Sequence, residues 1–148
     1  MKITSAAFKH NKMIPREYTC QGEGLNPPLR ISDLPKDTKS LALVMSDRDA
    51  PGGDFVHWLV WNFDPKVTEI KEGWMPTDAQ EGKNDAGKVG WIPPCPPFGK
   101  HRYEFHFYAL DSVIDLLPTS NKTDLRDEMK GKILEEAALV GFYEKTSA

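Results

Sequence analysis

Two aspartates and a histidine stand close together in the first half of the chain, next to apolar segments. Asp47 and Asp49 follow an apolar run, and His57 lies inside the next one. In an extended chain, side chains two positions apart share a face, so both carboxylates can enter one space. There they could bind a metal, act as an acid/base pair or orient neighbouring groups. The competing interpretations are that the aspartates cap turn amides and that His57 is an ordinary core histidine.

A second polar cluster, His101-Arg102-Tyr103, begins a later segment of strand-like sequence. His101 and Tyr103 share one strand face, where an imidazole N–H and a phenolic O–H both suit an anion. Arg102 points to the opposite face. It either contacts a ligand or pairs with Asp47 or Asp49 in a buried bridge that holds the loops together.

Just before this cluster comes a proline-rich segment with a single cysteine, Pro93-Pro94-Cys95-Pro96-Pro97. Proline has no backbone N–H and a fixed φ, so we expect a stiff loop in which the Cys95 amide is a rare free donor. The loop suits a rigid pocket wall, a surface connector or a peptide motif for a partner. No partner base marks Cys95 as reactive, so we expect an inert thiol. The sequence leaves open whether it bonds to Cys20.

Three apolar segments of strand length position these groups. Residues 41–45 form a continuous apolar run typical of a buried strand. Residues 55–63 are rich in aromatic and β-branched side chains, and residues 102–110 alternate with period two. The Pro-Gly-Gly sequence between the first two predicts a tight turn joining antiparallel neighbours. Residues 71–99 show little periodicity, and a loop that long is usually functional or forms a binding wall.

A helix is predicted only near the C-terminus. Apolar residues recur every four positions from Leu125 to Ala137, and the stripe ends at Ala138. Thr123 is a suitable N-cap. Leu139–Tyr143 then reads as a short final strand. The sequence therefore predicts a mainly β fold with one late helix.

Composition limits the classes of protein to consider. The 148 residues suit one domain, 1–148, and the formal net charge of -3 argues weakly against nucleic-acid binding. No apolar window approaches the roughly 18–20 residues of a membrane span. The N-terminus lacks a hydrophobic signal region, so we expect a cytoplasmic protein. With two cysteines the chain is not a disulfide scaffold.

Catalysis has little support in the sequence. There is no G-x-S-x-G motif, and no Ser or Cys has a recognisable base beside it. Asp47, Asp49, His57 and His101 are suitable metal-ligand types but lack a metal-binding spacing such as H-x-x-x-H. We therefore expect no metal, no cofactor and no enzyme activity, and a metal-assisted hydrolase is the least favoured alternative.

Four separated segments of the chain read YTCQGEGLNPPL (18–29), DRDAP with HW (47–51 and 57–58), PCPPFGKHRY (94–103) and GKILEEAALVGFY (131–143). In this order they resemble the phosphatidylethanolamine-binding protein family, in its bacterial and archaeal Raf-kinase-inhibitor-like branch. The resemblance implies a large central and a smaller antiparallel sheet with a helix near the C-terminus. It also implies binding, or inhibition of kinases or proteases, rather than turnover. A protein target, either a kinase or a protease, and a homodimer stay open as partners, because no matching residue set defines these roles.

The resemblance further implies a small preformed pocket for phosphate-like anions and phosphorylated head groups. Its expected lining is Asp47, Asp49, His57, His101 and Tyr103, with the Cys95 amide facing the anion and Pro51 and Arg102 in support. We expect both histidines to donate to the anion and both aspartates to position the donors. The alternative is a protein-interaction inhibitor that uses the proline-rich loop and residues 71–99 as its contact surface.

This chain departs from the family pattern at several positions. Arg48 replaces the proline between the two aspartates, which loosens the loop and adds a cation near the pocket mouth. Ala86 stands where an aromatic residue is usual. The other departures are Gly24, Asn26, Trp91 and Pro93. We expect these changes to alter the shape of the pocket and its preferred head group.

Overall fold

The structure is a computed structural model that describes residues 1–74 and 78–147. Its strands are β1 (Lys2–Thr4), β2 (Lys12–Met13), β3 (Leu29–Ser32), β4 (Ser40–Asp47), β5 (Phe55–Phe63), β6 (Glu69–Ile70), β7 (Gln80–Glu81), β8 (His101–Leu110) and β9 (Ile133–Tyr143). The helices are a short 3-10 segment, η1 (Arg16–Tyr18), and α1 (Lys122–Met129). The predicted mainly β fold with a helix near the C-terminus is therefore confirmed.

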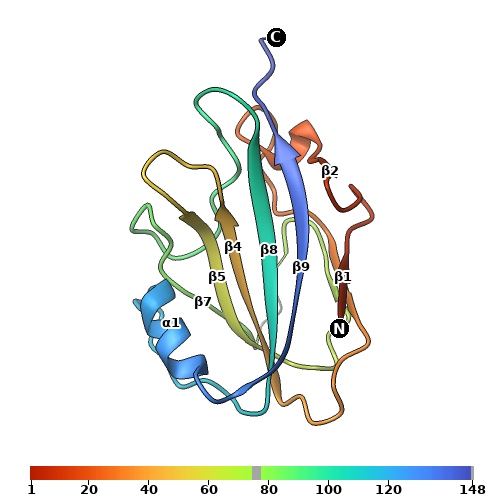
Figure 1. The fold of residues 1–148 in the computed structure, drawn as a ribbon, viewed down its shortest axis with the longest axis vertical. Coiled ribbons are helices and arrows are strands. Elements are labelled where there is room, and N and C mark those ends of the chain that lie inside the picture. The colour runs from red at the N-terminus through yellow and green to blue at the C-terminus, as the bar shows by residue number, and fades with distance from the viewer. Residues whose placement is uncertain (75–77, 148) are drawn as a thin grey trace.

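The strands form one large and one small sheet, as predicted. The large sheet has the order β2-β9-β8-β4-β5-β7, and its four long strands run side by side in Figure 1. The small sheet has the order β1-β3-β6. Pairing is antiparallel except between β2 and β9, which are parallel over two residue pairs. The predicted turn does join antiparallel neighbours, because β4 pairs with β5 in that sense.

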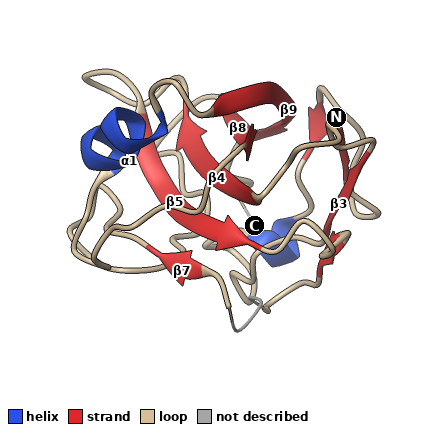
Figure 2. Cartoon of the chain, turned by 90° about the horizontal axis from the view of Figure 1, so that it is seen from below, coloured by secondary structure: helices blue, strands red, loops and turns tan. Residues whose placement is uncertain are grey.

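The large sheet is apolar on both faces because it packs against a different partner on each. Leu41, Leu43 and Met45 of β4 face the core shared with the small sheet. Ala42 and Val44 face the second core, which α1 covers. Figure 2 shows α1 and β3 at opposite sides of the large sheet. A strand buried on both faces reads as a continuous apolar run, which explains the sequence of β4.

The predicted helix is too long. The observed helix α1 begins after Asn121, whose side chain forms a capping box with Asp124, so Thr123 is not the N-cap. It ends at Met129, and Gly131, with φ of 77°, turns the chain into β9. Strand β9 then pairs with β8 along its length, and the predicted final strand is only its last part. A four-residue apolar spacing fits a strand as well as a helix because four is a multiple of two.

Gly141 lets the N-terminal segment pack directly on β9. A Cβ at this position would lie 2.6 Å from Ile14 Cγ1 and 2.7 Å from Phe8 Cε2. Both side chains are buried in the core between the sheets. The absence of a side chain at Gly141 therefore allows residues 8–14 to pack closely on the large sheet.

The long aperiodic segment contains little regular structure. In its described part, 71–74 and 78–99, it holds β7 and one isolated bridge between Lys83 and Val89. Residues 75–77 lie outside the described residues. Among the described residues no helix is long and apolar enough to cross a membrane.

Candidate functional site

The predicted polar residues converge on one cavity of about 260 Å³. It lies where β4 ends, β5 and β8 begin, and residues 91–100 form a proline-rich wall. Its lining is Asp47, Ala50, Pro51, Phe55, His57, Ile92, Pro93, Cys95, Pro97, His101 and Tyr103. A larger groove of about 540 Å³ lies between β1 and β9, but none of the predicted site residues lines it.

Sheet register places the floor of the cavity. Asp47 is the last residue of β4 and stands opposite Tyr103 on one side and Phe55 on the other. These three side chains therefore lie in one row across β8, β4 and β5. Phe55 was not predicted as a site residue, although its spacing from His57 could have identified it.

A β-bulge aims His57 into the cavity. The β4–β5 pairing passes from Met45–Trp58 to Ser46–Val56 and skips His57. The extra residue breaks the alternation of side chains. As a result Trp58 lies in the core between the sheets while its neighbour His57 lines the cavity.

Asp47 holds His101 by a short, buried hydrogen bond. His101 Nδ1 lies 2.7 Å from Asp47 Oδ2, and both side chains are almost fully buried. The other carboxylate oxygen accepts the backbone N–H of Asp49 at 2.9 Å. Because a carboxylate accepts, His101 donates through Nδ1 and keeps Nε2 for another partner.

Asp49, in contrast, lies at the rim and outside the cavity lining. Its carboxylate accepts the Arg102 backbone N–H at 2.8 Å and the Arg102 Nε–H at 3.2 Å. The Arg102 hydrogen bond lowers the pKa of Asp49, and burial opposes the shift. The predicted bridge between Asp49 and Arg102 is present, but it is exposed rather than buried. Its role is to tie the loop after β4 to the start of β8.

His57 is bound to the cavity wall through one ring nitrogen. Its Nδ1 lies 2.8 Å from the carbonyl oxygen of Ile92, so Nδ1 donates. Burial lowers the pKa of His57, while the Ile92 hydrogen bond and the charges of Asp47 and Asp85 oppose the shift. With Nδ1 donating to Ile92, the neutral ring has Nε2 left as an acceptor, whereas a protonated ring would donate through Nε2.

The Tyr103 hydroxyl is the one buried side-chain polar atom without a hydrogen-bond partner among the described residues. The residue is fully buried and borders the cavity. Burial raises the pKa of Tyr103, followed by the negative charge of Asp47, and the nearby Cys95 backbone N–H opposes the rise. Neither neighbour reaches hydrogen-bond geometry with the hydroxyl. It is therefore a protonated, desolvated group with an unused donor.

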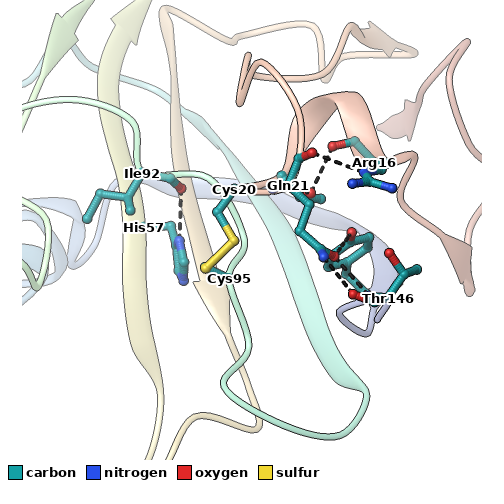
Figure 3. The surroundings of a disulfide bond; sticks show 9 residues. Arg16, Cys20, Gln21, His57, Ile92, Cys95 and Thr146 are labelled. Atoms are coloured by element: carbon teal, nitrogen blue, oxygen red, sulfur yellow. Dashed lines mark hydrogen bonds between the residues drawn. A yellow bond between two sulfur atoms is a disulfide. The ribbon is translucent and has the colours of Figure 1, made fainter. Parts of the chain in front are cut away.

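A disulfide bond fixes the wall of the cavity. Cys20 and Cys95, 75 positions apart, are bonded to each other, so Cys95 has no free thiol (Figure 3). The Cys20 N–H also donates to the Pro94 carbonyl at 3.0 Å. Trp91 Nε1–H donates to the Gly24 carbonyl at 2.7 Å. The sequence left this pairing open, and the signal for it was that both cysteines fall in family-like segments.

Of the departures from the family pattern, Pro93 lines the cavity, whereas Arg48 and Ala86 do not. Arg48 pairs with Asp54 across the loop between β4 and β5, with Nη1–Oδ2 at 3.1 Å. The ion pair therefore restrains this loop, which we expected to be looser. Ala86 is exposed. Among the described residues no group of three His, Cys, Asp or Glu side chains is arranged to hold a metal ion.

Known proteins resemble this chain in sequence and in fold. The sequence model described as phosphatidylethanolamine-binding protein matches residues 4–144. The chain belongs to this family. A Chlamydia muridarum relative, named UPF0098 protein, is 45% identical over 98% of this chain and 99% of its own length. A Pyrococcus horikoshii UPF0098 protein is 42% identical over 95% of this chain and 75% of its own length.

Two solved structures of the family share the fold. The putative phosphatidylethanolamine-binding protein homolog CT736 of Chlamydia trachomatis superposes with a TM-score of 0.94 at 44% identity, covering 97% of each chain. Escherichia coli YbcL superposes with a TM-score of 0.90 at 29% identity, covering 98% of each chain. The resemblance seen in the sequence motifs and the fold that it implied are therefore confirmed.

Proposed function

We propose that this protein binds a small phosphorylated anion, either phosphate itself or a phosphorylated head group, without turning it over. The observation that carries the proposal is the Tyr103 hydroxyl, which is fully buried, unpartnered among the described residues and beside the cavity. An unpaired buried donor costs about 1–3 kcal/mol, which a bound oxygen would recover.

The donors and acceptors around the cavity suit a phosphate that still carries a proton. Tyr103 O–H and the Cys95 N–H can donate to phosphate oxygens. His57 Nε2 can only accept while the ring is neutral, and a P–O–H group supplies the proton that it needs. Asp47 keeps His101 oriented with Nε2 free. Binding is therefore favoured by a proton on the ligand or on His57.

The test is calorimetric titration with three ligands: phosphate, phosphoethanolamine and sulfate. Sulfate has the shape of phosphate but offers no proton to His57. Well above pH of about 6.5 we expect phosphate to bind more tightly than sulfate. Because burial lowers the pKa of His57, we expect the affinities for both anions to rise, and the difference between them to shrink, as the pH falls below that range. Phosphoethanolamine tests whether a head group is preferred to the free anion.

The matched variants are His101→Ala and His106→Ala. Both residues belong to β8, but His106 lies outside the cavity lining and binds Glu104 and Glu136. His101→Ala should weaken phosphate binding about tenfold or more, as expected for a hydrogen bond to a charged group. His106→Ala should leave it unchanged. Equal affinities of wild type and His101→Ala, or affinities independent of pH, would contradict the proposal.

A protein-interaction role is the second candidate, and Phe98 favours it. This side chain is 78% exposed on the proline-rich loop, next to the lining residue Pro97. A large exposed aromatic side chain beside a pocket is typical of a contact surface. A pull-down with wild type and Phe98→Ser, with and without excess phosphate, separates this role from simple anion binding.

A further inference from the structure

The Cys20–Cys95 disulfide connects the cavity to the protein surface. Cys95 lines the cavity, and both cysteine residues are exposed to solvent. In Figure 3 the bond lies beside His57 and links two loops that are far apart in the sequence. A disulfide that a dissolved thiol can reach is of the labile kind, whereas structural disulfides resist reduction.

The proline-rich wall is anchored mainly on one side of Cys95. On the N-terminal side, Ile92 exchanges two hydrogen bonds with His57, one from its N–H at 3.1 Å and one to its carbonyl at 2.8 Å. The Pro94 carbonyl accepts a hydrogen bond from the Cys20 N–H. On the C-terminal side, residues 96–100 make no backbone hydrogen bond within the described chain until β8 begins at His101. The disulfide is thus the last cross-link before residues 96–100, which are held only by side-chain contacts such as the burial of Pro96 and the packing of Lys100 on the Phe142 ring.

We propose that Cys20 and Cys95 form a reversible thiol–disulfide exchange site that sets the anion affinity of the cavity. This inference rests on the proposed anion-binding function. The co-reactant is a small dithiol or a dithiol protein. One of its thiolates attacks a cysteine sulfur to form a mixed disulfide, and its second thiol then resolves that bond. Two electrons pass to the pair, which ends as two thiols, while the reductant becomes a disulfide.

Reduction acts on the cavity through the backbone of Cys95. Cys95 and Tyr103 both line the cavity, and the Cys95 backbone N–H lowers the pKa of Tyr103, so the two residues are close neighbours there. Without the bond to Cys20, the backbone of Cys95 is held only through its buried neighbours Pro94 and Pro96. A donor that is no longer fixed contributes less to binding. The oxidised protein is the tight-binding form, and the reduced protein is the weak-binding form.

A pair that opens and closes with the local thiol poise passes that redox condition on to the binding site.

The experiment compares phosphate affinity in the oxidised protein, in the protein reduced with dithiothreitol, and in the Cys20→Ser variant. Free thiols are counted under native conditions, and circular dichroism monitors the fold. We expect dithiothreitol to release both thiols from the folded protein. We expect phosphate affinity to fall about tenfold on reduction and to a similar degree in Cys20→Ser.

Gln21→Ala is the matched control. Gln21 neighbours Cys20 but anchors the C-terminal tail, since its side chain binds the backbone of Thr146 and the hydroxyl of Tyr143. This variant loosens the same loop without freeing Cys95, so it should keep the affinity of the oxidised wild type.

The outcomes separate the two proposals. Phosphate binding of equal strength in the oxidised and reduced proteins would overturn the exchange site alone. Thiols that appear only in denaturant, or a reduced protein that unfolds, would also overturn it. No phosphate binding by the oxidised protein would overturn the anion-binding function and the exchange site together.

Discussion

Replacing Tyr103 with phenylalanine should make the empty protein more stable and the phosphate complex weaker. The hydroxyl of Tyr103 is buried and lacks a partner among the described residues, so it lowers stability in the absence of ligand. The same group is a donor that a bound anion would use. One substitution therefore moves stability and affinity in opposite directions, which a purely structural tyrosine would not do.

The expected sizes follow from the burial of the hydroxyl. An unsatisfied buried polar group costs about 1–3 kcal/mol, and we take the low end, about 1 kcal/mol, because the hydroxyl borders a cavity. Losing a hydrogen bond to a charged ligand weakens binding about tenfold or more. Phosphate at 100 times Kd stabilises wild type by about 2.7 kcal/mol. The same concentration should stabilise Tyr103→Phe by only about 1.4 kcal/mol.

Urea denaturation with and without phosphate measures both quantities on the same samples. Tyr108→Phe is the control, because Tyr108 is on the same strand but outside the cavity lining. It should leave the stabilisation by phosphate unchanged. If empty Tyr103→Phe were less stable than wild type by about 1 kcal/mol or more, the hydroxyl would have a partner. If phosphate stabilised wild type and Tyr103→Phe equally, Tyr103 would not contact the ligand.

Three further predictions concern stability. Reducing the Cys20–Cys95 bond opens a loop of 75 positions. Because the open loop gives the unfolded chain more conformational entropy, reduction should lower the unfolding free energy by up to about 4.5 kcal/mol in urea titrations. A loss below about 1 kcal/mol would contradict this explanation. Because the pKa of His57 is lowered in the folded state, the unfolded chain takes up the proton first, so stability present above pH of about 6.5 is lost as the pH falls. His57→Gln should reduce this loss of unfolding free energy at low pH. An unchanged pH dependence of stability in His57→Gln would argue against a role for His57. Gly141→Ala places a Cβ 2.6 Å from a neighbouring side chain, so it should lower the unfolding free energy by about 1–3 kcal/mol in thermal unfolding. Gly87→Ala is the control for backbone strain alone, because Gly87 has a positive φ and no atom near its Cβ position.

The central strands could be predicted from the sequence because burial on both faces dominates their composition. The predicted segment Phe55–Phe63 has the same bounds as β5. The prediction for the C-terminal segment was wrong because its apolar spacing suits both a helix and a strand, and only pairing with β8 decides between them. Local propensity does not contain that information, since the partner strand is distant in sequence.

The candidate site was predictable by residue type but not by geometry. His101 and Tyr103 follow from simple alternation along β8 and do line the cavity. The position of His57 does not follow from simple alternation, because His57 lines the cavity through a bulge that skips it in the pairing. A bulge depends on the register of two strands, and nothing in the sequence of one strand reveals it. The disulfide likewise depends on two loops that meet only in the folded chain.

The two aspartates show why the competing interpretations of one short motif need not exclude each other. Asp47 is the last residue of β4, so strand alternation still applies to it and turns it toward His101. Asp49 lies beyond the strand, where alternation no longer holds, and it binds Arg102 at the rim instead. Yet Asp47 also caps the backbone N–H of Asp49 through its other oxygen. The same carboxylate thus shapes the turn and orients the imidazole, so the position of the loop and the tautomer of His101 depend on one side chain.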